Sequence, residues 1–132
     1  MVKVLDSFAL MAYLEKEPGY EKVKDLFIKA SQSGRPLLMS TVNWGEVFYV
    51  LIRDHGIEEA ERIQKIIETF PIEFLPADLI VTKQAALYKA AKKLPYADCF
   101  AAALAKVHKG EIVTGDKDFK AIENEIKVIW VG

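Results

Sequence analysis

The sequence feature that most constrains the fold is a regular alternation of short β-forming runs with helical patterns. The β-forming runs, rich in Val, Ile, Leu and Phe, occupy residues 2–5, 37–39, 72–75, 112–114 and 127–131. Apolar residues at roughly 3.6-residue spacing fill the intervening stretches, around residues 7–17, 23–30, 43–55, 58–69, 78–93 and 97–109. This alternation predicts an α/β fold: a three-layer sandwich of about five mainly parallel strands with helices on both faces.

Composition narrows the class of protein. The 132 residues suffice for a single domain, 1–132, and carry 18 basic and 19 acidic side chains for a net charge of −1. No general positive field attracts nucleic acid, so any binding of phosphate must be local or metal-assisted. One cysteine, Cys99, excludes an internal disulfide, and no apolar run reaches membrane-spanning length. These features predict a cytoplasmic protein with no membrane partner.

Acidic residues follow the predicted strands. Asp6 comes directly after the first strand, and Asp116 and Asp118 lie in the loop after the fourth. Glu46 and Asp98 stand early in predicted helices. Because the carboxyl ends of parallel strands meet at one edge of a sheet, where ligands bind in such folds, we expect these carboxylates to converge.

Convergent carboxylates favour a bound cation. Two like charges about 4 Å apart repel by about 4 kcal/mol at an effective dielectric of 20. Oxygen ligands select Mg²⁺ or Mn²⁺, and the sequence offers no Cys/His spacing for zinc. Such an ion completes its coordination shell with substrate phosphate oxygens and activates water, which suits hydrolysis of phosphodiesters.

At these residues the chain resembles a known family. Leu5-Asp6-Ser7, residues 41–46, residues 96–103 and residues 114–119 look like the motifs of a PIN domain, and in particular of VapC-type toxins. The resemblance implies a PIN-like fold and a Mg²⁺- or Mn²⁺-dependent ribonuclease that acts on RNA. It also implies a homodimer held inactive by a VapB-like antitoxin. The family's catalytic and metal-binding acids correspond to Asp6, Glu46, Asp98 and Asp116, with Asp118 as an auxiliary ligand.

Each acid also has a purely structural interpretation. Asp6 could cap the first helix, but Ser7 could serve as that cap equally well, which leaves Asp6 free to be the central metal ligand. Asn43 and Glu46 have the spacing of a capping box, so Glu46 could stabilise its helix, bind metal, or do both. Asp98 could favour a helix N-terminus electrostatically. The loop acids 116 and 118 could serve ordinary turn chemistry.

Small polar and basic residues near the same edge are candidate substrate contacts. They are Ser7, Thr41, Asn43, Thr114 and Lys117. The two histidines, His55 and His108, fall in the last turns of predicted helices, away from that edge. Their placement argues against histidine acid–base chemistry with the 2′-hydroxyl as nucleophile, so hydrolysis should leave 5′-phosphate and 3′-hydroxyl ends.

Two alternatives compete with the nuclease. A catalytically silent PIN-like module could bind RNA or protein without cleaving, although the intact acids argue against it. A receiver or phosphatase of similar βα order would need paired acids after the first strand. Asp6 stands alone there and position 8 is Phe, so this alternative is disfavoured.

Overall fold

One five-stranded parallel sheet organises the molecule, and the computed structural model describes all of residues 1–132. The strands run in the order β3-β2-β1-β4-β5, and every pairing is parallel. Their bounds are β1 Lys3–Leu5, β2 Leu37–Ser40, β3 Ile72–Leu75, β4 Glu111–Thr114 and β5 Val128–Trp130. The predicted mainly parallel sheet is confirmed.

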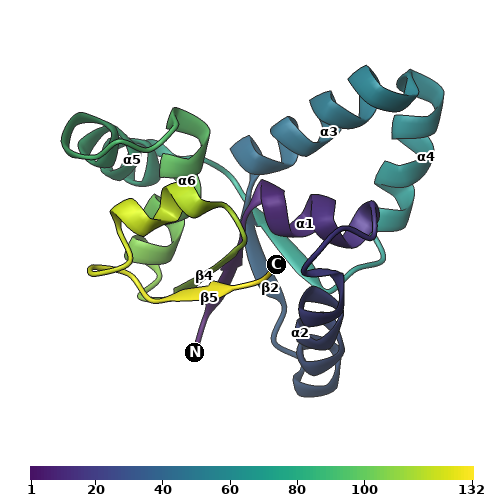
Figure 1. Cartoon of the computed structure of the whole chain (residues 1–132), viewed down its shortest axis with the longest axis horizontal. Helices are drawn as coiled ribbons and strands as arrows, with labels where there is room; N and C mark the ends of the chain where they lie inside the picture. Colours follow the sequence, from purple (N-terminus) through teal and green to yellow (C-terminus); the bar gives the residue numbers. More distant parts are fainter.

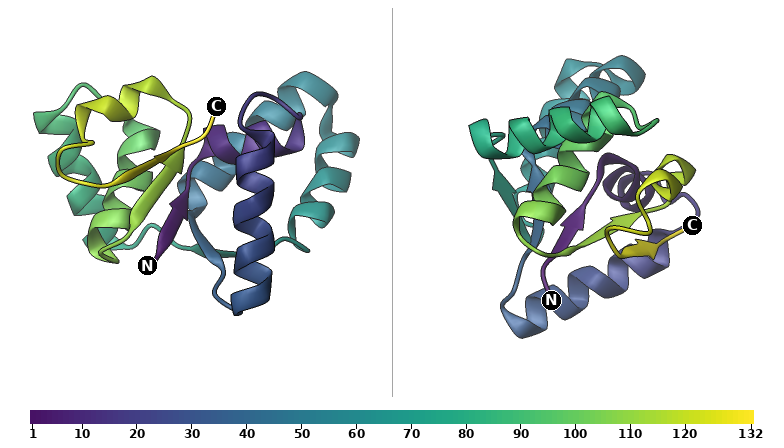
Figure 2. Two further views of the ribbon diagram at one scale, coloured as in Figure 1. Left: turned by 60° about the horizontal axis from the view of Figure 1, so that its bottom comes forward. Right: turned by 90° about the vertical axis from the view of Figure 1, so that its left-hand side faces the viewer.

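Helices cover both faces of this sheet (Figure 1). They are α1 Ser7–Leu14, α2 Tyr20–Ser33, α3 Thr41–His55, α4 Ile57–Ile67, α5 Leu79–Ala91 and α6 Tyr96–Val107, with a 3₁₀ helix, η1, at Lys117–Ala121. Figure 2 shows α1 to α4 on one side of the sheet and α5 and α6 on the other. The three-layer prediction is therefore confirmed. None of the helices combines the length and the hydropathy that crossing a bilayer requires.

Alternation along the strands divides the core in two. Val4 pairs with Ile112, and both pack with α5 and α6. The next pair, Leu5 and Val113, packs with α1 to α4 on the opposite face. Successive side chains of a strand point to opposite faces, so strands buried on both sides read as continuous apolar runs. The strands could be predicted from the sequence because they appear in it as such apolar runs.

Two helix boundaries differ from the sequence prediction. α3 begins at Thr41 rather than near Asn43, because the Ser40 side chain caps it by accepting a hydrogen bond from the Val42 amide at 3.2 Å. The predicted capping role of Asn43 is therefore wrong. α1 ends at Leu14 rather than near residue 17, because Lys16 adopts a left-handed conformation with φ of 52° that turns the chain away.

The strand order reverses next to β1. The chain continues from β1 to β2 on one side, and it returns much later to place β4 on the other side. Connections leave the carboxyl ends of β1 and β4 in opposite directions, so a crevice opens between them, and such switch points are where open α/β sheets bind ligands. Asp6 follows β1 and residues 115–118 follow β4 at this point.

Candidate active site

A pocket of about 370 Å³ opens at the switch point. Five of its nine lining residues are acidic and none is basic: it is lined by Asp6, Ser7, Phe8, Met11, Glu17, Pro18, Glu46, Asp98 and Asp116. Four of the five acids predicted to form the site therefore line one cavity, and the fifth, Asp118, is close to two of them.

Three carboxylates form the tightest group. One oxygen from each of Asp98, Asp116 and Asp118 lies within 4.8 Å of the others. Asp98 is held in the first turn of α6, and Asp116 caps η1 by accepting a hydrogen bond from the Asp118 amide at 2.9 Å. A hard divalent cation with oxygen ligands matches the chemistry of this donor set, which includes Asp118.

Asp6 lies at the base of the pocket and is only 2% exposed. One carboxylate oxygen accepts a hydrogen bond from the Ala9 amide at 2.8 Å, and the other accepts one from the Thr114 hydroxyl. The expectation that Ser7 would replace Asp6 as the helix cap is therefore wrong. α1 begins at Ser7 itself, so the extended residue before it occupies the capping position.

Burial perturbs two of these acids. Loss of solvation raises the pKa of Asp6 to about 8, with repulsion from Asp98 and Asp116 adding to the shift and the Thr114 and Ala9 hydrogen bonds opposing it. Burial likewise raises the pKa of Asp98 to about 7, helped by the charges of Asp116, Glu46 and Asp118. Carboxylates that repel one another in a partly desolvated cavity are poised to exchange their protons for a cation.

Glu46 is fixed by a clasp that joins three elements. The Ser7 hydroxyl donates to Glu46 Oε1 at 2.5 Å and lies 3.2 Å from the backbone oxygen of Asn43. The side-chain nitrogen of Asn43, Nδ2, donates a hydrogen bond to the Ala97 carbonyl at 3.0 Å and lies 3.4 Å from Glu46 Oε1. The clasp therefore ties the start of α1 to α3 and to the residue preceding Asp98 in α6.

The predicted substrate contacts separate into two groups. Asn43 and Thr114 are fully buried, so neither side chain is exposed to a substrate; Thr114 instead bonds Asp6 and accepts a hydrogen bond from the Asp116 amide at 2.9 Å. Thr41 and Lys117 are exposed, and Ser7 is half-buried in the pocket wall. The hydrogen bonds of Asn43 and Thr114 therefore hold neighbouring acids in position.

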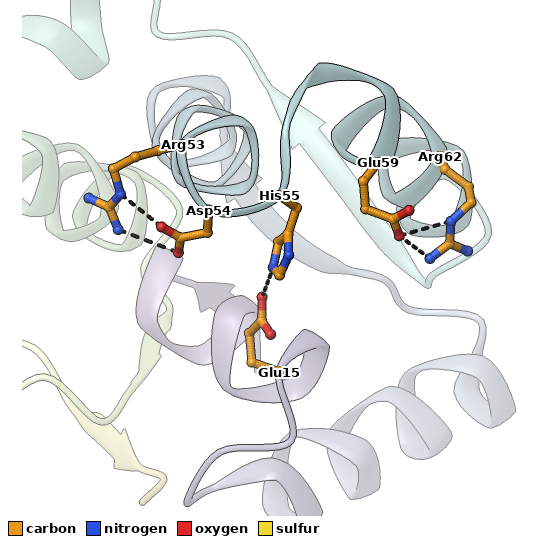
Figure 3. A network of polar contacts seen from close by, with 6 residues as sticks. All are labelled: Glu15, Arg53, Asp54, His55, Glu59 and Arg62. Carbon is orange, nitrogen blue, oxygen red and sulfur yellow. Dashed lines mark hydrogen bonds and ion pairs between the residues drawn. The ribbon is translucent and has the colours of Figure 1, made fainter.

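A second hollow, of about 550 Å³, adjoins the acidic pocket and shares Met11 and Glu17 with it. In Figure 3, His55 at the end of α3 points to Glu15 just beyond α1, and these two side chains are 3.0 Å apart. The other ion pairs drawn there lie along α3 and α4. Neither histidine lines the acidic pocket, in agreement with the placement predicted from the sequence.

Comparison with known proteins assigns the chain to a family. The sequence matches the PIN domain family over residues 3–125. The chain belongs to the PIN domain family. No curated protein sequence matches it significantly.

Solved structures with similar folds include VapBC complexes. The PIN domain superposes on a chain of DNA-bound VapBC from Salmonella typhimurium with a TM-score of 0.78 and 17% identity, covering 98% of this chain and 97% of that one. For VapBC2 from Rickettsia felis, bound to a promoter DNA fragment, the TM-score is 0.76 at 18% identity with both chains fully covered. Mycobacterium tuberculosis VapC20, a sarcin-ricin loop cleaving toxin, superposes with a TM-score of 0.70 at 17% identity, and the match covers 90% of this chain and 93% of that one.

Sequence reasoning missed four residues of the PIN domain's pocket: Phe8, Met11, Glu17 and Pro18. Phe8 is exposed and Met11 is half-buried on α1, and a helical pattern of apolar residues gives no sign of a cavity beside them. The others belong to the α1–α2 connection, whose path depends on the turn at Lys16. No local signal places that connection beside the strand ends.

Proposed function

We propose that this PIN domain is a Mg²⁺- or Mn²⁺-dependent endoribonuclease that hydrolyses RNA phosphodiester bonds, and that it is the toxin of a VapBC-type pair. The observation that carries the proposal is the convergence of Asp6, Glu46, Asp98 and Asp116 on one pocket at the switch point. The VapC20 structure, that of a sarcin-ricin loop cleaving toxin, has the same fold.

The residues have distinct roles in this proposal. Asp98, Asp116 and Asp118 would hold the cation directly, and Asp6 and Glu46, which line the same pocket, would complete its surroundings. A divalent cation bound there would offset charge developing on the scissile phosphate and lower the pKa of a water molecule. Thr114 and the clasp of Ser7 and Asn43 keep the carboxylates in place through the hydrogen bonds described above.

The proposed partners follow from the family resemblance and the neighbours. RNA is the substrate, a VapB-like antitoxin is the inhibitor, and the active unit is a homodimer in the cytoplasm. The VapBC neighbours are themselves toxin–antitoxin complexes, which supports the antitoxin.

One observation favours the silent-module alternative. Both oxygens of Asp6 already accept hydrogen bonds, and its raised pKa keeps it largely protonated at neutral pH. Each carboxylate oxygen can nevertheless accept a second interaction, so these bonds do not prevent Asp6 from facing a cation.

Cleavage of a defined RNA in Mn²⁺, in Mg²⁺ and in EDTA tests the proposal. We expect cleavage only with metal, with ends that RNA ligase joins directly because they carry 5′-phosphate and 3′-hydroxyl groups. Asp98→Asn should remove the activity. Cleavage that persists in EDTA, or ends that carry 2′,3′-cyclic phosphate, would contradict the metal mechanism, and uncleaved RNA under all conditions would favour the silent module.

A further inference from the structure

Phe8 is a large apolar side chain in an otherwise acidic pocket. It lies in the first turn of α1, two residues after Asp6, and is 42% exposed. Single exposed apolar residues are common on protein surfaces, so exposure alone carries little weight. What distinguishes Phe8 is its place in the wall of the pocket that holds Asp98 and Asp116.

The Phe8 ring rests on Gly115, the residue between Thr114 and Asp116. A Cβ atom added to Gly115 would overlap both the ring and the carbonyl oxygen of Val131. Only glycine lets the ring lie this close to the backbone of the loop that carries two of the acids. Part of the ring is therefore covered by the backbone of this loop, and the side chain keeps 42% of its surface exposed where it lines the pocket.

The other aromatic side chains near the acids are already paired. Trp44 stacks on Phe48 with ring centroids 5.1 Å apart and an interplanar angle of 9°. Tyr96 makes an edge-on contact with Phe100 at 5.0 Å. Neither lines the acidic pocket, so Phe8 is the only aromatic ring in its wall.

The pocket is negatively charged, so affinity for RNA has to come from something other than basic side chains. Five acids and no base line the cavity, and the net charge of the whole chain is −1. Apart from a bound cation, nothing in the wall attracts RNA phosphates. Stacking of a base on an aromatic face supplies affinity without positive charge and tolerates different bases, since every base has a π-face.

We infer that the Phe8 ring is a stacking platform for a nucleobase next to the scissile phosphate. This inference rests on the proposed ribonuclease function and adds a base-binding subsite to it. The subsite selects an unpaired nucleotide, because a base within a duplex is already stacked on both sides.

The test combines a protein change with an RNA change. Phe8→Leu keeps apolar bulk over Gly115 but removes the aromatic face, and Phe8→Tyr is the matched control that keeps it. With a single-stranded RNA that the wild-type protein cleaves, Phe8→Leu should raise KM by roughly 5- to 150-fold with little change in kcat, and Phe8→Tyr should not.

An abasic scan of the same RNA locates the stacked nucleotide. Removal of one base beside the cleavage site should raise KM for the wild-type protein by a similar factor and should add nothing for Phe8→Leu. Wild-type protein is enough for this half of the test, so a folding defect in the variant does not obscure it.

The outcomes separate the two proposals. Unchanged KM for Phe8→Leu, or no abasic position that matters, overturns the platform while the nuclease stands. Wild-type protein that neither binds Mn²⁺ nor cleaves RNA overturns the proposed function instead. If Phe8→Leu weakens binding of a basic antitoxin peptide and leaves KM for RNA unchanged, Phe8 is a protein contact and the platform is wrong.

Discussion

At the scale of one residue, Asp6 is a buried acid whose negative charge destabilises the metal-free protein. Its carboxyl group caps α1 and bonds Thr114, yet it is almost completely buried beside other acids. Replacing its negative charge with a neutral amide keeps most of these hydrogen bonds and removes the unfavourable charge. Residues that serve a charged ligand often destabilise the unliganded protein in this way.

The metal-free protein should accordingly become less stable as pH rises. The pKa of Asp6 is raised to about 8 from 3.8, so between these values the folded state holds a proton that the unfolded state has released. The free energy of unfolding therefore falls with increasing pH across this window, by up to about 1.4 kcal/mol per pH unit for such a group. Urea unfolding in EDTA at pH 5.5, 7 and 8.5 measures this slope.

Asp6→Asn should reduce that slope, leaving the part due to the raised pKa of Asp98, and should stabilise the metal-free protein at pH 8.5 by about 1–3 kcal/mol, because residue 6 no longer ionises. The exposed acid Asp25 on α2 provides the matched control, and Asp25→Asn should leave the slope as it is. A variant at position 6 that unfolds at every pH would show that the carboxylate is needed for structure, contrary to this account.

At the scale of elements, the clasp between α1, α3 and α6 depends on Asn43. Its side chain is fully buried and supplies the hydrogen bond to the Ala97 carbonyl, while its own Oδ1 has no partner. Exchanging the amide's oxygen and nitrogen would point an oxygen at two acceptors, so the orientation is fixed by its neighbours.

Asn43→Ala should lower the free energy of unfolding by about 1–3 kcal/mol, since it removes the hydrogen bond that the fully buried Asn43 side chain donates to the Ala97 carbonyl. Equilibrium urea unfolding measures the change. Asn124, exposed near the carboxyl-terminal end of the chain, offers a control whose alanine variant should stay within about 0.5 kcal/mol of wild type. Equal stabilities for the two variants would show that the Asn43 hydrogen bond is dispensable.

The elements themselves were largely predictable from the sequence. Apolar strands and helical spacing located every strand and helix, because burial on both faces of a parallel sheet leaves a strong local pattern. Cap positions were less predictable. Ser40, not Asn43, caps α3, and Asp6, not Ser7, caps α1, because several adjacent polar residues can satisfy the same amides and tertiary contacts decide among them.

The site was predictable in part for the same reason. Strand polarity brings Asp6 and Asp116 to one edge, and this follows from topology alone. The partners of the acids, such as Thr114 with Asp6 and Ser7 with Glu46, join residues 108 and 39 positions apart in the chain. Such pairs depend on packing between elements, and no local pattern encodes them.

At the scale of the whole molecule, cation binding should stabilise the fold. An ion that binds only the folded state at 100 times its dissociation constant adds about 2.7 kcal/mol. Thermal unfolding with increasing Mn²⁺ should therefore show a rising Tm. The rise should be larger at pH 8 than at pH 6, because protons compete for carboxylates with pKa values of about 7 and about 8.

Asp98→Asn should remove most of the Mn²⁺-dependent rise in Tm, because it deletes one of the three grouped carboxylates. Asp78→Asn is a suitable control, since Asp78 caps α5 and does not line the acidic pocket. A rise in Tm that is the same in wild type and Asp98→Asn would place the cation elsewhere.

The sheet separates two hydrophobic cores, and the acids are drawn from both sides of it. Asp98 and Asp116 belong to elements of the α6 side, while Asp6 and Glu46 belong to the α1 and α3 side. Each core can therefore accept conservative substitutions locally, and the spacing between the two pairs of acids depends on the pairing of β1 with β4 and on the Ser7 and Asn43 hydrogen bonds that join α1, α3 and α6. Mutational tolerance in this protein should follow that division: changes within either core are absorbed locally, whereas changes at the β1–β4 pairing alter the metal-binding geometry directly.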